Sequence, residues 1–369
     1  MTVSPALEQI PADILAAADY EHRAAAHLHP ATLAWLAGGS GTEQTLRANR
    51  DSFASLHILP RLLNAFGAAS TGLELCGTQF DHPALLAPLG HQGLLHPEAE
   101  RASARAAQAT ATGYIASTVS SLSLEDIAQA TCGPKWFQLY WQPRRADTLN
   151  LLRRAEAAGY QALVVTLDAP VQAISRRAQL AGFRMPDGPP ANLAGHSPMP
   201  QVALEPGQSV LLHGMMTEAP QWEDLRWLLE QSRVPVLIKG VMRADDALRL
   251  QAMGIAGLIV SNHGGRALDG APASLQALPA LRSALGDEYP LLLDGGVRSG
   301  TDIFKALAMG ADAILIGRLQ GYALATAGAL GVAHMLKLVK DELELCMALA
   351  GTPTLNDIRP DCLTGAPTC

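Results

Sequence analysis

The sequence predicts an α/β fold: a (β/α)8 TIM barrel of parallel strands, with an N-terminal helical segment before it and a long loop after strand four. Eight short apolar runs recur along the chain, and stretches with helical spacing follow them. Runs that are apolar throughout are typical of strands buried on both faces, as in parallel sheets. Eight β-then-α units favour a closed barrel, and an open doubly wound sheet is the structural alternative.

Each candidate strand is bounded by turn residues. In chain order the strands are expected at Ala84–Gly90, Gly113–Ser117, Trp136–Trp141, Ala162–Asp168, Val234–Val241, Gly257–Gly264, Pro290–Val297 and Ala313–Arg318. Alanine and leucine recur at helical spacing between several of them. This spacing predicts helices at Pro97–Thr110, Ala146–Ala158, Arg243–Met253, Ser274–Leu285 and Thr301–Met309.

The 369 residues are expected to form a single domain overall. Residues 1–83 are predicted to be a helical extension, with a possible hairpin, that packs on the barrel and plugs its lower end or lines its mouth. Residues 84–369 are predicted to form the barrel itself. The connection Ala169–Trp222 is far longer than one helix requires, and its part Met185–Pro200 is rich in proline and glycine. We interpret that part as a mobile lid, with disorder as the alternative.

Composition and charge narrow the classes of function. The formal net charge is −7, so the chain lacks the basic footprint of a nucleic-acid-binding protein. The five cysteines form no C-x-x-C pair and no zinc spacing, so we expect no metal site. Met1–Ile14 has no signal-peptide pattern, and the apolar stretch Gly321–Leu336 contains glycines and His334, as in a packed helix. We therefore expect a soluble cytoplasmic protein without a membrane partner.

Polar residues gather where the predicted strands end, which is where barrel enzymes place their chemistry. These residues are Gln138, Tyr140, Thr166, Asp168, Lys239, Ser261, Asn262, His263, Arg266, Asp294, Gly295, Gly296, Arg298, Gly317 and Arg318. Burying so many polar and ionic groups around one axis would cost at least several kcal/mol unless a ligand bound there. The sequence therefore predicts an active site at this end of the barrel.

The ends of strands seven and eight have the features of a phosphate site. Asp294–Gly300 and Gly317–Arg318 each precede a helix, and each combines glycine with arginine. Glycine lets the backbone approach a ligand, a helix N-terminus offers N–H donors, and arginine supplies positive charge. Barrels often bind phosphate at these two loops. A tight turn with two surface arginines is the alternative.

At these residues the sequence resembles the FMN-dependent 2-hydroxy acid oxidases and dehydrogenases. That family includes glycolate oxidase, lactate oxidase, mandelate dehydrogenase and the flavin domain of flavocytochrome b2. The most specific stretch is Ser261–Gly270 (SNHGGRALDG). The other matching stretches, in the same order as in the family, are Gly38–Leu46 with Asn49 and Arg50, Phe137–Tyr140, Ile238–Gly240, Asp294–Gly300 and Ile316–Arg318.

The resemblance implies a catalytic role for five residues. His263 would be the base that removes a proton from the substrate, and Asp168 would stabilise the cationic imidazole. Lys239 would stabilise negative charge on the reduced flavin. Arg266 would grip the substrate carboxylate, and Tyr140 would bond the substrate hydroxyl oxygen.

The resemblance also implies an FMN site. Ser117, Gln138 and Thr166 would contact the flavin ring, and Asp294 would accept hydrogen bonds from the ribityl hydroxyls. Arg298, Gly317 and Arg318 would hold the phosphate. The remaining cofactor contacts would be Pro88, Leu89, Gly90, Lys239, Ser261, Gly295 and Gly296.

The implied reaction is oxidation of an (S)-2-hydroxy acid to the 2-oxo acid, with electrons passing to FMN and then to oxygen or another acceptor. A homo-oligomer is expected by the same resemblance. An FMN enzyme acting on a specialised biosynthetic substrate and a non-catalytic flavoprotein are the alternatives.

Three positions depart from the family pattern. Trp35 stands where a tyrosine usually binds the substrate carboxylate, and an indole can donate one hydrogen bond but accept none. Ser175 stands where the family has an arginine, and a small loop shift could bring Arg176 there instead. Gly90 replaces a frequent alanine beside the flavin, or simply fits a tight strand end. The first two departures favour a substrate that is larger or more apolar than a small hydroxy acid.

Overall fold

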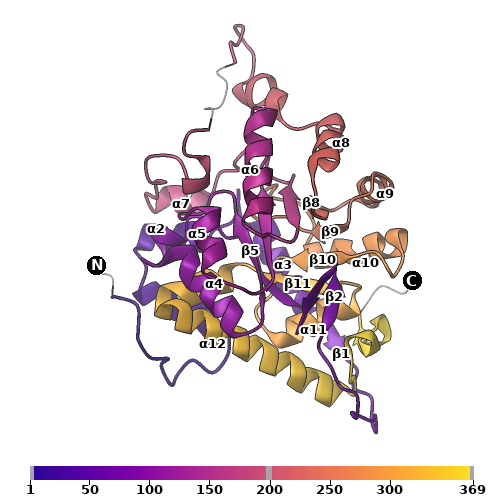
Figure 1. The fold of residues 1–369 in the computed structure, drawn as a ribbon. Coiled ribbons are helices and arrows are strands. Elements are labelled where there is room, and N and C mark those ends of the chain that lie inside the picture. The colour runs from indigo at the N-terminus through magenta and orange to yellow at the C-terminus, as the bar shows by residue number, and fades with distance from the viewer. Residues whose placement is uncertain (1–3, 197–201, 366–369) are drawn as a thin grey trace.

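The computed structural model describes residues 4–196 and 202–365, and it contains the predicted barrel. Eight parallel strands close in the order β10-β11-β4-β5-β6-β7-β8-β9 (Figure 1). Their bounds are β4 Ala84–Leu86, β5 Gly113–Ser117, β6 Lys135–Leu139, β7 Leu163–Thr166, β8 Val236–Val241, β9 Gly257–Val260, β10 Leu291–Asp294 and β11 Ala313–Ile316. All eight predicted strands are confirmed, and the predicted polar residues lie at or just beyond the carboxyl ends of the strands.

Helices surround the barrel and connect its strands. Their bounds are α4 Ala99–Ala109, α5 Leu124–Gln129, α6 Arg145–Ala157, α8 Trp222–Gln231, α9 Ala244–Ala252, α10 Ser274–Leu285, α11 Gly300–Ala308 and α12 Arg318–Ala350. The five predicted helices correspond to α4, α6, α9, α10 and α11.

The last of these helices, α12, contains the apolar stretch Gly321–Leu336. Its length and composition alone would allow α12 to cross a membrane, but 67% of its most apolar window is buried within the fold. That burial is typical of a core helix. The helix is interrupted at Ala327 and Gly328, where the backbone leaves helical geometry.

The barrel interior is filled by a cluster of apolar side chains that includes a residue from each strand. The eight are Leu85, Ile115, Trp136, Val164, Leu237, Ile259, Leu292 and Leu315. A hairpin of β2 (Leu73–Leu75) and β3 (Thr78–Phe80) covers the amino end of the barrel, where the Phe80 ring meets Trp136 edge-on at a centroid distance of 5.6 Å. Among the described residues, the lower end is therefore closed by packing, and the main cavity lies at the carboxyl end.

Other N-terminal elements lie at the opposite end of the barrel. They are α1 (Asp19–Arg23), α2 (Pro30–Ala37) and α3 (Gln44–Ala54). Trp35 of α2 lines the cavity at the carboxyl end of the strands. The N-terminal residues thus contribute both to the closed lower end and to the open mouth.

The long connection after β7 carries short helices, among them α7 (Arg176–Leu180) and the single turn Ala191–Leu193. Asn192 is fully buried, and its amide donates to the carbonyl oxygens of Ser117 and Thr118 and accepts from Leu124 N–H. The predicted lid Met185–Pro200 is thus fastened to the barrel at Asn192, while its residues 197–200 lie outside the described residues.

One strained position yields a test of the fold. Ala111, just past the end of α4, is exposed and has a left-handed backbone with φ of 51°. A side chain in that region costs about 1–2 kcal/mol, whereas glycine adopts it freely. We expect Ala111→Gly to raise the free energy of unfolding by up to about 1 kcal/mol in urea titrations. Ala109→Gly, at the exposed last residue of the same helix, should lower it by up to about 0.5–1 kcal/mol; a loss of stability at both positions would contradict the account.

Candidate active site

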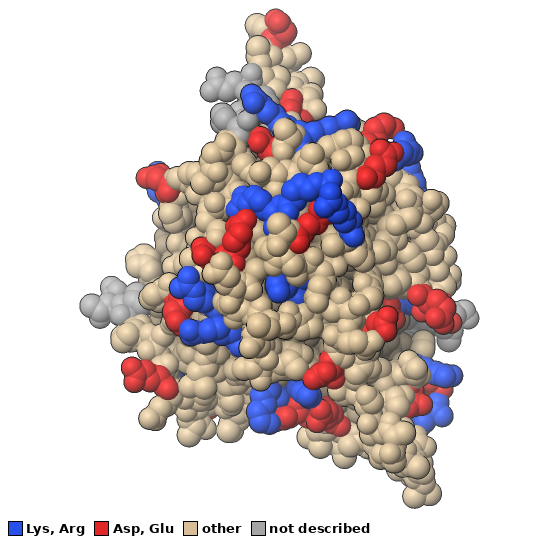
Figure 2. Space-filling model, viewed as in Figure 1, with Lys and Arg blue, Asp and Glu red and all other residues tan. Residues whose placement is uncertain are grey.

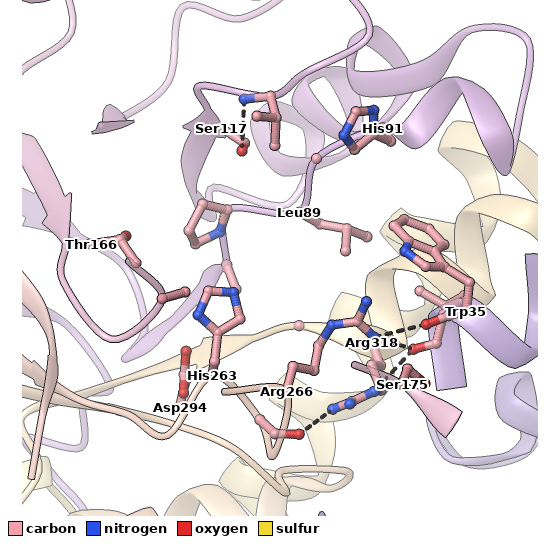
Figure 3. Close-up of a pocket in the computed structure, with 18 of the residues that line it drawn as sticks. Trp35, Leu89, His91, Ser117, Thr166, Ser175, His263, Arg266, Asp294 and Arg318 are labelled. Carbon is pink, nitrogen blue, oxygen red and sulfur yellow. Dashed lines mark hydrogen bonds between the residues drawn. The ribbon is translucent and has the colours of Figure 1, made fainter. Parts of the chain in front are cut away.

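A cavity of about 670 Å³ opens at the carboxyl ends of the strands (Figure 3). This volume is within the usual range of sites for small molecules and cofactors. It is lined by most of the predicted site residues, namely Trp35, Pro88, Leu89, Gly90, Ser117, Gln138, Tyr140, Thr166, Lys239, His263, Arg266, Asp294, Gly295, Gly296, Arg298, Gly317 and Arg318. Asp168 and Ser261 lie behind this wall, bonded to His263 and Lys239.

His263 is held by its backbone and by a carboxylate. It follows β9 with φ of 60°, a left-handed conformation that is uncommon outside glycine and often marks a functional site. Its Nδ1 lies 2.8 Å from Asp168 Oδ1, and its backbone N–H donates to Ser261 Oγ at 3.0 Å. An ionised Asp168 accepts from Nδ1–H, so Nε2 carries the free lone pair. Nε2 faces the cavity 3.5 Å from Tyr140 Oη, and it is available as a base.

The carboxylate of Asp168 stays ionised because of its neighbours. Burial alone would raise its pKa, but the positive charge of Lys239 and the contact with His263 outweigh burial and lower the pKa to about 2. Lys239 Nζ lies 3.7 Å from Asp168 Oδ2 and 3.0 Å from Asp294 Oδ2. Burial works against the charge on Lys239, and these two carboxylates reverse that effect and raise its pKa. Both groups are therefore charged at neutral pH.

Gly240 allows this cluster to close. Its φ is 107°, and a Cβ there would lie 2.5 Å from Cβ of Asp168 and 2.8 Å from its backbone nitrogen. No side chain fits that space, so glycine is required for the end of β8 to approach Asp168.

Tyr140 adds a hydroxyl beside His263. Burial is the main cause that raises the pKa of Tyr140. The phenol therefore stays protonated at neutral pH and can donate a hydrogen bond into the cavity.

Two half-buried arginines, Arg266 and Arg318, form a positively charged end of the cavity. Arg266 Nη1 donates to the carbonyl oxygens of Trp35 at 2.8 Å and Gly38 at 2.9 Å, and Arg318 donates to Leu36, Gly38 and Gly264. Figure 3 shows both arginines beside Trp35. Within residues 4–196 and 202–365, neither guanidinium pairs with a carboxylate. Burial, Arg266 and Arg298 lower the pKa of Arg318 to about 9. Two half-buried guanidinium groups without a carboxylate partner favour an anionic ligand.

Arg298 has a partner that the sequence did not predict. Its Nε donates to Glu21 Oε2 at 3.0 Å, so α1 contributes to the predicted phosphate end of the site. Burial alone would raise the pKa of the Glu21 carboxyl, but the positive charge of Arg298 and its hydrogen bond outweigh burial and lower that pKa. Nothing in the local pattern around Glu21 indicates this contact, because it joins residues 277 positions apart.

The donor set fits FMN. Asp294 Oδ1 is buried without a hydrogen-bond partner among the described residues, while Oδ2 pairs with Lys239. An orphaned carboxylate oxygen beside a cavity requires a hydroxyl or another donor, and a ribityl chain has several. Arg298, Arg318 and Lys239 line the same cavity and add the positive charge that suits an extended anion.

The region predicted to bind the substrate carboxylate differs from expectation. Ser175 lines the cavity, and its hydroxyl caps α7 by accepting from Ala178 N–H. Arg176 is exposed and is not part of the cavity wall, and Arg177 pairs with Glu43. The structure therefore does not bring Arg176 into the site, whereas Arg266 lines the cavity.

Gly90 and Trp35 have packing reasons for their identities. A Cβ at Gly90 would lie 2.5 Å from Val119 Cγ2 and 2.9 Å from the Val119 carbonyl oxygen, so Val119 occupies the space of an alanine methyl.

Trp35 stacks on Phe183 with ring centroids 5.3 Å apart and planes at 14°. The guanidinium of Arg266 lies over the Trp35 ring at 5.5 Å. Phe183 and His91, which also line the cavity, were missed in the sequence because neither lies on a periodic strand or helix.

Comparison with known proteins gives a consistent picture. The family described as FMN-dependent dehydrogenase matches residues 24–365. An L-lactate oxidase of Alicycliphilus denitrificans is 57% identical over 98% of this chain and 99% of its own length. A 4-hydroxymandelate oxidase of Amycolatopsis orientalis is 38% identical over 93% of this chain and 96% of its own. A crystal structure of mandelate oxidase with (S)-2-phenylpropionate superposes with a TM-score of 0.85 at 36% identity, covering 95% of this chain and 98% of that one.

Arg298 and Arg318, the two arginines of the predicted phosphate site, can be tested by a binding experiment that needs no turnover. If Arg298 and Arg318 form a phosphate site, inorganic phosphate should stabilise the protein stripped of cofactor. At ten times its dissociation constant, phosphate should add about 1.4 kcal/mol to the free energy of unfolding. Urea titrations in phosphate and in chloride at equal ionic strength measure the difference. Arg298→Gln should remove most of it, and an equal effect of phosphate on that variant would refute the assignment.

Proposed function

Because the chain belongs to the FMN-dependent dehydrogenase family, whose members use FMN, we propose that it oxidises (S)-2-hydroxy acids to 2-oxo acids with oxygen as the electron acceptor. The observation that carries this proposal is the His263–Asp168 pair, which faces the cavity beside Tyr140 and Arg266. A base, a carboxylate that stabilises its cation, a phenol and a cationic anchor are the groups that this reaction requires.

The substrate is held by its acid end in this proposal. Arg266 has donors left after its bonds to Trp35 and Gly38, and it binds the carboxylate. Tyr140 donates to the substrate hydroxyl oxygen. These contacts place the reacting carbon near Nε2 of His263, so the free energy of binding orients the substrate toward the base.

His263 acts as the base in this proposal, and Asp168 stabilises its protonated form. His263 Nε2 takes a proton from the substrate, and the imidazolium that results is stabilised by the Asp168 carboxylate 2.8 Å away. FMN supplies the two-electron oxidant when bound. Lys239, held by Asp168 and Asp294, would help to hold the cofactor and would supply a fixed positive charge that stabilises its reduced form.

Relatives guide the choice of substrate and acceptor. The Alicycliphilus and Roseobacter relatives, 57% and 43% identical, are L-lactate oxidases. We therefore propose L-lactate as a small substrate and hydrogen peroxide as the reduced product of oxygen. A cytoplasmic homo-oligomer without membrane or nucleic-acid partners stays part of the proposal. A non-catalytic flavoprotein is disfavoured because binding alone would not require the base and its carboxylate.

The proposal is tested at the base. Purified protein should be yellow, should lose its visible flavin absorption when mixed anaerobically with L-lactate, and should form peroxide when air is admitted. His263→Ala should keep the oxidised flavin spectrum, because no cofactor contact is removed, and slow bleaching by about 10²–10⁴-fold. Stopped-flow spectroscopy measures both. A wild-type flavin that no 2-hydroxy acid reduces would refute the function, and unchanged rates in His263→Ala would refute the role of the base.

A second test concerns the acid end of the site. Ser175→Arg loses the cap of α7, which costs about 1 kcal/mol of stability, but places a second cation at the cavity wall. If Arg266 alone binds the carboxylate in the wild type, the variant should lower KM for L-lactate by about 10-fold or more, since a charge-assisted bond contributes about 1.5–3 kcal/mol. Ser175→Ala, the control, should lose the cap without lowering KM. A KM that rises equally in both variants would show that this wall does not contact the carboxylate.

A further inference from the structure

His91 lines the same cavity but has no part in the proposed reaction. It follows Gly90 with φ of 54° and ψ of 35°, a left-handed conformation that costs about 1 kcal/mol or more outside glycine. Its N–H donates to the Val119 carbonyl oxygen at 3.0 Å, which fixes the turn against the loop after β5. The fold thus supports a strained residue whose effect is to set an imidazole at the cavity wall.

The imidazole of His91 is unpaired among the described residues. Its one ring contact is an edge-on approach to Trp35, with centroids 6.4 Å apart and planes at 77°. Burial lowers the pKa of His91, so the ring is neutral at neutral pH and offers one donor and one acceptor. A half-buried polar group without a protein partner in a cavity wall can hydrogen-bond a ligand that enters the cavity.

The surroundings of His91 indicate what that ligand part looks like. Trp35 stacked on Phe183 presents a flat aromatic wall, and Leu89 and Val119 complete an apolar lining. In Figure 3, His91 and Trp35 lie beyond Leu89 on the side away from His263 and Asp294. A hydroxy acid held at its acid end by Arg266 therefore has this lining available for its side chain.

We propose that His91 and Trp35 form the side-chain subsite, and that this subsite selects aromatic 2-hydroxy acids whose ring carries a hydroxyl. The ring lies against Trp35, and the phenolic hydroxyl exchanges a hydrogen bond with the imidazole. This inference rests on the proposed function for its reaction, but it concerns only which side chain is preferred. His91 is a specificity residue in this account, and it takes no proton in the reaction.

The test compares two substrates that differ by one hydroxyl. Wild-type protein should have a kcat/KM for (S)-4-hydroxymandelate about 3- to 10-fold above that for (S)-mandelate, the size expected for one neutral hydrogen bond. His91→Phe keeps an aromatic ring beside Trp35 but cannot form the bond, so the ratio should fall to about 1 or below. His91→Gly suits the left-handed backbone and also lacks the bond, so it should lose the preference even if the phenylalanine variant folds poorly.

L-lactate is the internal control, because its methyl group is too short to use the subsite. Oxidation of L-lactate shows whether a variant still carries out the reaction, the oxidised flavin spectrum reports folding, and the ratio of the two aromatic substrates is the readout of the subsite. A wild-type ratio of 1, or a ratio that both variants leave unchanged, overturns the inference while lactate oxidation still upholds the proposed function. If no hydroxy acid is oxidised, the function fails, and spectral titration with benzoylformate and its 4-hydroxy analogue still tests the subsite by the ratio of their dissociation constants.

Discussion

The site depends on one buried ion cluster, in which the ammonium of Lys239 lies between the carboxylates of Asp168 and Asp294. Removing one member of such a cluster leaves an uncompensated buried charge, which typically costs about 3–5 kcal/mol. Because the folded pKa of Asp168 is lowered to about 2, its contribution to stability is present above the ordinary pKa of 3.8 and is lost as the pH falls from there toward 2. At neutral pH the cluster is intact, so His263 always faces an ionised partner.

The charged residues around the cavity form two groups with different electrostatic surroundings. Carboxylates surround Lys239 and support the base, whereas Arg266 and Arg318 bind backbone carbonyl oxygens and leave their charge uncompensated. Backbone dipoles can orient a guanidinium without neutralising it, so these arginines keep their affinity for an anion. This arrangement suits a protein that must bind both a phosphate and a carboxylate, and it explains why a chain with a net charge of −7 still has a cationic site.

Sequence patterns predicted the strands and helices, because their apolar residues recur at regular spacing. The strands were visible because both faces are buried, and the chemistry was visible because polar residues interrupt apolar runs at Asp168, Lys239 and Asp294. What the sequence could not indicate were contacts between distant, aperiodic residues. The pairing of Glu21 with Arg298 and the stacking of Phe183 on Trp35 depend on how α1 and the long connection fold back. The outward position of Arg176 was also hidden, because the start of α7 sets it.

The residues proposed to carry out the reaction lie in or near the strands, whereas those proposed to select the substrate lie in the connections. Lys239 and Asp294 lie in strands, and Asp168 and His263 lie within three residues of strand ends, where hydrogen-bonded neighbours fix them. Trp35, His91, Ser175 and Phe183 lie in a helix or loops outside the barrel, and these can change without disturbing the ion cluster. Under the proposed function, the departures at Trp35 and Ser175 would change which side chain and acid group are accepted, and they would leave proton removal by His263 intact. Strain at His91 is tolerated for the same reason: the turn is bonded to Val119, so the barrel holds the imidazole where a substrate would meet it.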